Sequence, residues 1–272
     1  MENLHVFAIK EFLSFIRPEN CFFTAGIAVS GYMIFNQANA VLLPLFLAIF
    51  CGTGASYAYN HLTDKAEDAI NRSRLNAFVL DGKRGRNAVA ALYLTGLAFS
   101  IFTSFMSLLV YLFLLLISFL YSGDARLKEK FIVKNVNTGM GIALSFLVGA
   151  MAGGLASADM LLYVLIVFML GFAANVLGDI KGCIGDKAIG MKTLPILLGT
   201  EKTKVIIYSV VSLMSVLVVA LGYAAFYPLL PFMAAAIFLL HAGRMKATRA
   251  SLLSSFTFLP LMLVLTKIIG GG

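Results

Sequence analysis

Charged side chains are scarce in this sequence. Only 12% of its 272 residues are Asp, Glu, Lys or Arg, whereas 60% are hydrophobic. Soluble domains carry about 25% charged residues and less apolar content, so the composition excludes an ordinary water-soluble enzyme and a disordered chain. The mean hydropathy of +0.93 points instead to a protein that lies within a membrane.

Cysteine is also rare. The three residues Cys21, Cys51 and Cys183 are odd in number and scattered in or near apolar stretches. They predict neither a disulfide framework nor a cysteine-based zinc site. No Ser-His-Asp or Cys-His grouping is evident in the sequence, so we do not expect nucleophilic catalysis by a triad.

Long stretches without any charged residue are the main feature of the sequence. One helical crossing of a bilayer needs about 20 apolar residues, with a range of roughly 17–25. The three longest stretches can therefore hold two crossings each and the other three one each, which predicts nine transmembrane helices. The stretches are 20–63, 87–123, 135–158, 160–178, 205–243 and 250–266.

Each of the three longest stretches needs a reversal point. Asn-Gln-Ala-Asn at 36–39 and the proline-containing segment 227–231 are clear candidates, and 104–107 is the best choice in the middle stretch. Alternation of apolar and polar residues, typical of membrane barrels, is absent. We expect an all-α fold, with residues 1–272 forming a single bundle of nine helices around a central cavity.

The basic residues lie almost entirely on one side of this predicted topology. Of the 21 Lys and Arg residues, all but Lys267 fall at the N-terminus or in the loops on the same side. Short loops rich in Lys and Arg remain in the cytoplasm, so the N-terminus is predicted to be cytoplasmic in a multi-pass protein of the cell membrane. Topology accounts for the net charge of +8, and membrane lipid rather than nucleic acid is the expected partner.

Two oxygen-rich motifs end predicted spans on this cytoplasmic side. Asn60, Asp64 and Asp68 follow the second span at intervals of four residues, and Asn175 and Asp179 repeat the spacing near the end of the sixth. On a helix such residues share one face. Carboxylates brought together repel unless a cation lies between them, and Mg²⁺ is commonly held by carboxylates and substrate phosphates. The motifs therefore predict a Mg²⁺–polyphosphate site, the alternative being helix ends that simply face water.

These motifs resemble those of the UbiA superfamily of intramembrane prenyltransferases. Asn60, Asp64 and Asp68, followed by Ile-Asn-Arg at 70–72, match the first signature of that family, and Asn175 and Asp179 match the second with Asn in first place. The prolines usual after the first signature are missing, and Gly182 stands where a further aspartate is usual. The resemblance implies nine helices and transfer of an isoprenyl chain from its diphosphate to a lipophilic, usually aromatic acceptor.

The resemblance also implies roles for individual residues. Asp64, Asp68 and Asp179 are expected to be catalytic as Mg²⁺ ligands, and two Mg²⁺ ions are expected. Asp186 either ligates metal or caps the loop that follows it. Tyr121 either faces the prenyl carbocation or is an interface tyrosine. His61 is a possible base or a helix-end histidine. The complete expected metal set is Asn60, Asp64, Asp68, Asn175, Asp179 and Asp186, with Arg72 and Lys128 binding the diphosphate.

Three functions are compatible with these features. The leading hypothesis is Mg²⁺-dependent prenyl transfer to an aromatic quinone precursor, in the cytoplasmic half of the membrane. The alternative within the family is prenylation of geranylgeranylglyceryl phosphate in archaeal lipid synthesis. A divalent-cation transporter could use the same carboxylates, although transport sites more often lie near the midplane. A CDP-alcohol phosphotransferase is disfavoured because its DGxxAR start is absent after Asp81-Gly82.

Overall fold

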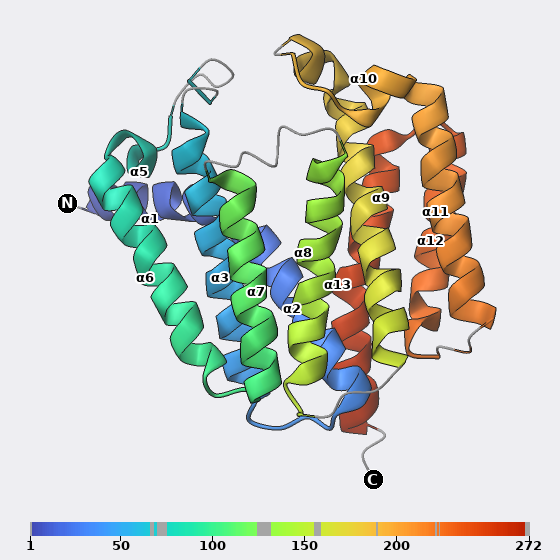
Figure 1. The fold of residues 1–272 in the computed structure, drawn as a ribbon, viewed down its shortest axis with the longest axis horizontal. Coiled ribbons are helices and arrows are strands. Elements are labelled where there is room, and N and C mark those ends of the chain that lie inside the picture. The colour runs from blue at the N-terminus through green and yellow to red at the C-terminus, as the bar shows by residue number, and fades with distance from the viewer. Residues whose placement is uncertain are drawn as a thin grey trace.

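The computed structural model describes residues 2–65, 68–69, 75–123, 132–154, 159–188, 190–220, 222 and 224–269. All regular elements in these ranges are helical, which confirms the predicted fold class (Figure 1). In chain order they are α1 (Glu2–Ile16), α2 (Pro18–Phe35), α3 (Leu42–Thr63), α5 (Ala77–Leu80), α6 (Gly82–Ser100), α7 (Phe105–Ser122), α8 (Val133–Met151), α9 (Asp159–Ala188), α10 (Leu194–Leu198), α11 (Thr200–Ala220), the 3₁₀ helix η2 (Ala224–Leu229), α12 (Leu230–His241) and α13 (Met245–Ile269).

Each of the three longest uncharged stretches divides into two helices. The break between α2 and α3 lies where the sequence predicts it. The break before α12 overlaps the predicted segment 227–231 but starts earlier, because α11 ends at Ala220 and α12 begins at Leu230. The break in the middle stretch was placed too late, because α6 ends at Ser100 and α7 already begins at Phe105. Ser104 is the N-cap of α7, and its hydroxyl oxygen accepts a hydrogen bond from the backbone N–H of Ser107 at 3.1 Å. Because an N-cap serine marks the start of a helix, Ser104 is the last residue of the turn and not its first.

Four of the described helices are long and apolar enough to cross a bilayer. They are α3, α7, α9 and α11, and α12 belongs to a shorter apolar helix. The nine crossings and the cytoplasmic N-terminus remain predictions.

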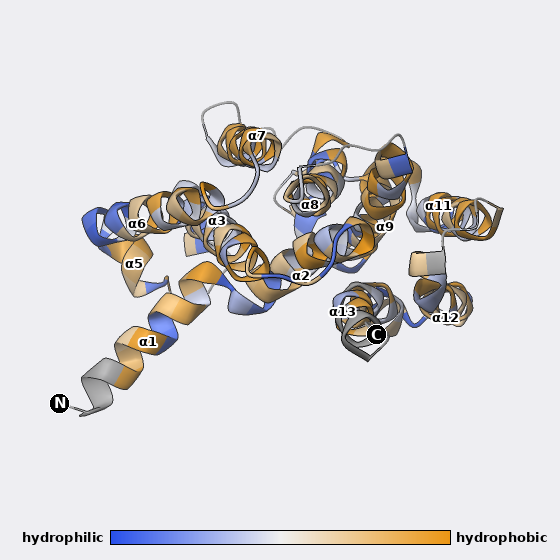
Figure 2. Ribbon diagram, turned by 90° about the horizontal axis from the view of Figure 1, so that it is seen from below, coloured by the Kyte–Doolittle hydropathy of each residue, from blue (hydrophilic) through white to orange (hydrophobic). Residues whose placement is uncertain are grey.

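Helix α2 packs closely against α8 in the middle of the bundle, where it also contacts α3 and α13 (Figure 2). Glycines permit this close approach. A Cβ atom added at Gly149 would overlap the backbone carbonyl of Ala28, and one added at Gly31 would overlap that of Phe146. Small residues let transmembrane helices approach to backbone contact. The interface between α2 and α8 is therefore set by main-chain packing.

Helix α1 leaves the bundle and points away from it (Figure 2). Over residues 6–16, where the structure describes the side chains of α1, only Phe15 and Ile16 at its C-terminal end are buried, and Phe15 stacks on Phe78 with ring centroids 5.2 Å apart. Glu11 fixes this end, since its carbonyl oxygen accepts a bond from Asn76 Nδ2 at 2.8 Å and its carboxylate accepts one from the N–H of Ala77 at 2.6 Å. The C-terminal end of α1 is thereby held against the start of α5.

Candidate functional site

A cavity of about 610 Å³ lies between α2, α3, α7, α8, α9 and α13. The polarity of its wall changes along two of the helices. On α3 the wall runs from Ile49 to Asn60, and on α7 it runs from Tyr111 and Leu114 to Ser122. The cavity is thus apolar in its interior and polar where α3 and α7 end. This volume is within the range of sites for small ligands, and the gradient suits a molecule with an apolar chain and a charged head.

Both sequence motifs lie at this polar end. The C-terminal ends of α3, α7 and α9 and the N-terminal end of α8 gather at the same end of the bundle, uppermost in Figure 1. Asn60, Asn175 and Tyr121 form part of the cavity wall, whereas the predicted carboxylate ligands are not among its lining residues. The carboxylates lie beside the cavity and the amides reach into it.

The first motif does not lie on one continuous helix, contrary to the prediction. Helix α3 ends at Thr63 and Asp64 is its C-cap, so Asp68 lies beyond α3, although its N–H still donates to the Asp64 carbonyl at 2.8 Å. Asn60 connects this turn to α7. Its Nδ2 donates to Asp64 Oδ2 at 2.7 Å and its Oδ1 accepts from the Ser122 hydroxyl at 2.8 Å.

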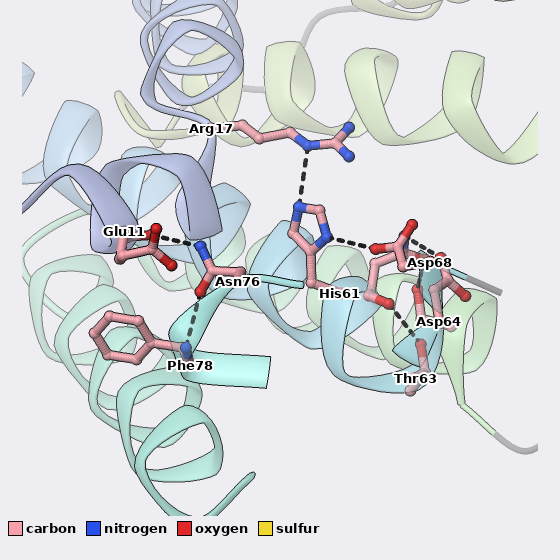
Figure 3. Close-up of polar contacts among 10 residues, drawn as sticks. Glu11, Arg17, His61, Thr63, Asp64, Asp68, Asn76 and Phe78 are labelled. Atoms are coloured by element: carbon pink, nitrogen blue, oxygen red, sulfur yellow. Dashed lines mark hydrogen bonds and ion pairs between the residues drawn. The ribbon is translucent and has the colours of Figure 1, made fainter. Parts of the chain in front are cut away.

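His61 is buried and orients Asp68 (Figure 3). Arg17 Nε donates to His61 Nε2 at 3.3 Å, and His61 Nδ1 lies 3.2 Å from Asp68 Oδ2. Because Nε2 accepts a hydrogen bond, this network assigns the proton to Nδ1, which donates to the carboxylate. His61 therefore holds Asp68 as a hydrogen-bond donor, a role that neither of the interpretations drawn from the sequence included.

The second motif is enclosed by the first turn of α8. Asp179 is 2% exposed and accepts hydrogen bonds from Lys134 Nζ and Asn135 Nδ2, both at 2.7 Å. The sequence analysis missed both partners. The only signal for them in the sequence is that Lys134 and Asn135 stand where the uncharged stretch 135–158 begins. One turn before Asp179, the Nδ2 of Asn175 is buried without a hydrogen-bond partner and the residue lines the cavity. Buried donors of this kind point to a ligand.

The two motifs converge on Tyr121. Tyr121 lines the same cavity as Asn60 and Asn175, and the charges of Asp64 and Asp179 both act on its hydroxyl. Asp186, in the last turns of α9, interacts in the same way with Asp179 and Lys134. No group of three His, Cys, Asp or Glu side chains within the described ranges is compact enough to be a ready-made metal site. The metal-ligand assignments therefore stay predictions, and Arg72 and Lys128 lie outside the described residues.

Two arginines in the cavity wall escaped the sequence analysis. Arg17 lies at the junction of α1 and α2, with its guanidinium carbon 5.2 Å from the centre of the Tyr57 ring. It adopts a left-handed backbone conformation with a φ of 53°, which is strained for a residue other than glycine. Arg249, in α13, packs against α9 at Gly178. Arg249 directly precedes an uncharged stretch and Arg17 lies three residues before one, which is the only signal for them in the sequence.

A family model described as the UbiA prenyltransferase family matches residues 21–263. The chain belongs to this family. A digeranylgeranylglyceryl phosphate synthase of Methanoregula boonei is 32% identical over 207 residues, covering 74% of this chain and 73% of that protein.

The chain also shares its fold with solved structures of UbiA homologues. A UbiA homologue of Archaeoglobus fulgidus bound to GPP and Mg²⁺ has a TM-score of 0.75 at 17% identity, covering 93% of this chain and 99% of the other. A structure of digeranylgeranylglyceryl phosphate synthase in membranes has a TM-score of 0.69 at 22% identity and covers 99% of both chains.

The family membership confirms the resemblance inferred from the two motifs and makes the protein a membrane-embedded prenyltransferase. The side chains around its polar cavity end also fit Mg²⁺. The predicted ligand atoms are carboxylate and amide oxygens, which a hard divalent cation prefers. The unpartnered amide of Asn175 gives this UbiA prenyltransferase a further group that a bound diphosphate oxygen would satisfy.

Proposed function

We propose that the protein is a digeranylgeranylglyceryl phosphate synthase, which adds a second geranylgeranyl chain to geranylgeranylglyceryl phosphate. The similarity to relatives that carry this name, over about three quarters of the chain, is the observation that carries the proposal. It favours the lipid acceptor over the aromatic quinone precursor, which was the leading hypothesis from sequence. Two departures from the family signatures, the absence of prolines after the first signature and the presence of Gly182, fit the lipid enzymes less well. They do not outweigh this similarity.

The reaction exchanges one carbon–oxygen bond for another. The bond between C1 of the prenyl chain and the diphosphate breaks, the acceptor hydroxyl oxygen bonds to C1, and the hydroxyl proton leaves with the diphosphate. When bound, Mg²⁺ would neutralise negative charge on the leaving diphosphate. We assign Asp64, Asp68 and Asp179 to hold the expected two Mg²⁺ ions. The remaining assigned ligands are Asn60, Asn175 and Asp186.

Other residues of the chain complete this proposed site. Arg72 and Lys128 bind the diphosphate oxygens, and the aromatic face of Tyr121 stabilises positive charge at C1. Near Tyr121, the amide N–H of Asn175 donates to the diphosphate. The apolar wall around Ile49 and Leu114 holds the prenyl chain and excludes water from the carbocation. We further propose a single domain of nine crossings in the cell membrane, with its N-terminus and this site on the cytoplasmic side.

Product analysis tests the function directly. Purified protein is incubated with Mg²⁺, geranylgeranyl diphosphate and either geranylgeranylglyceryl phosphate or an aromatic quinone precursor, and the products are identified by mass. We expect the doubly prenylated glyceryl phosphate. Product from the aromatic acceptor alone would overturn the proposal, and Mg²⁺ uptake by reconstituted vesicles without any prenyl donor would favour a transporter.

The variant Asp64→Ala tests the proposed metal site in the same assay. We expect loss of turnover with an unchanged unfolding temperature, because Asp64 lies at a polar helix end and its removal leaves no cavity in the core. Glu201→Ala is the matched control, since Glu201 is an exposed carboxylate at the start of α11 with 83% of its side chain accessible. Full activity of Asp64→Ala would show that the metal assignment is wrong.

A further inference from the structure

One part of the cavity wall is cationic. Arg17 and Arg249 come from opposite ends of the chain, and both line the cavity. The guanidinium carbon of Arg17 lies 5.2 Å from the centre of the Tyr57 ring on α3. The charges of Arg17 and Arg249, and that of Glu19, all act on the Tyr57 hydroxyl. Arg17 is half-buried, whereas Arg249 is exposed at the cavity mouth.

These two guanidinium groups keep hydrogen-bond donors available. Arginine has five N–H donors, and Arg17 uses its Nε–H on His61. Neither arginine forms an ion pair with a carboxylate in the described part of the chain, although Glu19 lines the same cavity. Two guanidinium groups in the wall of one cavity, neither ion-paired within the described residues, are suited to a phosphate, which arginine binds through paired N–H donors.

The reaction brings two anionic groups into this cavity. The donor has a diphosphate, which the carboxylates of both motifs would hold through bound Mg²⁺. The acceptor has a phosphate of its own. Tyr121 and Tyr57 both line this cavity. The charges of Asp64 and Asp179 act on the Tyr121 hydroxyl, and those of the two arginines act on the Tyr57 hydroxyl. The cavity thus offers a second, cationic position next to the proposed metal site.

We propose that Arg17 and Arg249 bind the phosphate of the acceptor, and thereby select a phosphorylated glycerolipid over an uncharged one. The inference rests on the proposed function, because it takes the acceptor to be a glyceryl phosphate. Charge on the acceptor then determines its orientation: the phosphate lies against the arginines, with the hydroxyl directed to C1 of the donor near Tyr121.

Arg249→Gln is the cleaner variant for the test, because Arg17 also touches His61, which holds Asp68. Binding of geranylgeranylglyceryl phosphate and of its phosphate-free counterpart, geranylgeranylglycerol, is measured on the purified full chain without donor. Binding of an unreactive geranylgeranyl diphosphate analogue with Mg²⁺ is measured separately. We expect Arg249→Gln to weaken binding of the phosphorylated acceptor roughly 10- to 100-fold, with the other two affinities unchanged.

Arg244→Gln is the matched control, since Arg244 is an exposed arginine just before α13 that does not line the cavity. It removes one positive charge from the same region and should leave all three affinities unchanged. Arg249→Lys should restore part of the lost affinity. An equal loss for both acceptors, or a loss confined to the diphosphate analogue, would overturn the inference. Arginine-dependent binding of the phosphorylated acceptor without any product would sustain the inference and overturn the proposed function instead.

Discussion

The contact between Lys134 and Asp179 offers a quantitative test of how the second motif is built. Lys134 Nζ lies 2.7 Å from Asp179 Oδ1, and the two side chains are 26% and 2% exposed. At this distance the attraction between unit charges is about 6 kcal/mol for an effective dielectric constant of about 20. Desolvation of the buried carboxylate offsets most of it, which leaves a coupling of about 1.5–3 kcal/mol, as for hydrogen bonds to charged groups.

A double-mutant cycle measures this coupling. We expect Asp179→Asn and Lys134→Met each to lower the free energy of unfolding by about 2–3 kcal/mol, because each removes one charge of the pair and leaves the other charge uncompensated. The double variant should lose only about 3 kcal/mol, since it leaves neither charge behind. Unfolding is followed in detergent micelles by denaturant titration.

Glu201 and Lys204 provide a control pair with the same separation. Their N–O distance is also 2.7 Å, but 83% of the Glu201 side chain is exposed. Exposed pairs of this kind contribute about 0.5 kcal/mol. If the coupling in the Asp179 pair is no larger than in this control pair, the burial of Asp179 does not strengthen its contact with Lys134 and the reasoning fails.

Two further predictions concern packing and metal affinity. Gly149→Ala should destabilise the protein by about 1–3 kcal/mol because the added methyl overlaps the Ala28 carbonyl. On the same helix, the methyl added by Gly141→Ala meets nothing within 4 Å, so this control variant should be neutral or stabilising. Equal unfolding temperatures for the two variants would contradict this prediction. His61→Ala should raise the Mg²⁺ concentration needed for half-maximal activity roughly 10- to 100-fold because Asp68 loses its donor, and an unchanged Mg²⁺ dependence would show that Asp68 is not a ligand.

The helical framework could be predicted from the sequence because it depends on a property that single residues carry. Absence of charge over long stretches is required of any segment in lipid, and it placed two helices in each long stretch. The error at Ser104 has a local cause. A serine is equally compatible with a turn and with the cap that ends it, and the hydrogen bond to Ser107 decides between them.

The candidate site was predicted less completely because its residues come from separate helices. Spacing along the chain identified Asn60 and Asn175, which the structure places in one cavity wall. It could not show that Lys134 from α8 reaches Asp179 in α9, nor that Arg249 faces the same cavity as Arg17. Contacts between helices depend on rotation and register, which the polar residues of one sequence do not determine.

The left-handed backbone at Arg17 has a practical consequence for engineering the chain. The same residue follows the last residue of α1, is the N-cap of α2 and donates a hydrogen bond to His61, which holds Asp68. Shortening the amino terminus up to this corner, or fusing a tag there, would disturb the carboxylate two contacts away. Expression variants that keep α1 intact should therefore differ in Mg²⁺ requirement from those trimmed to Pro18, even though α1 itself lies outside the bundle.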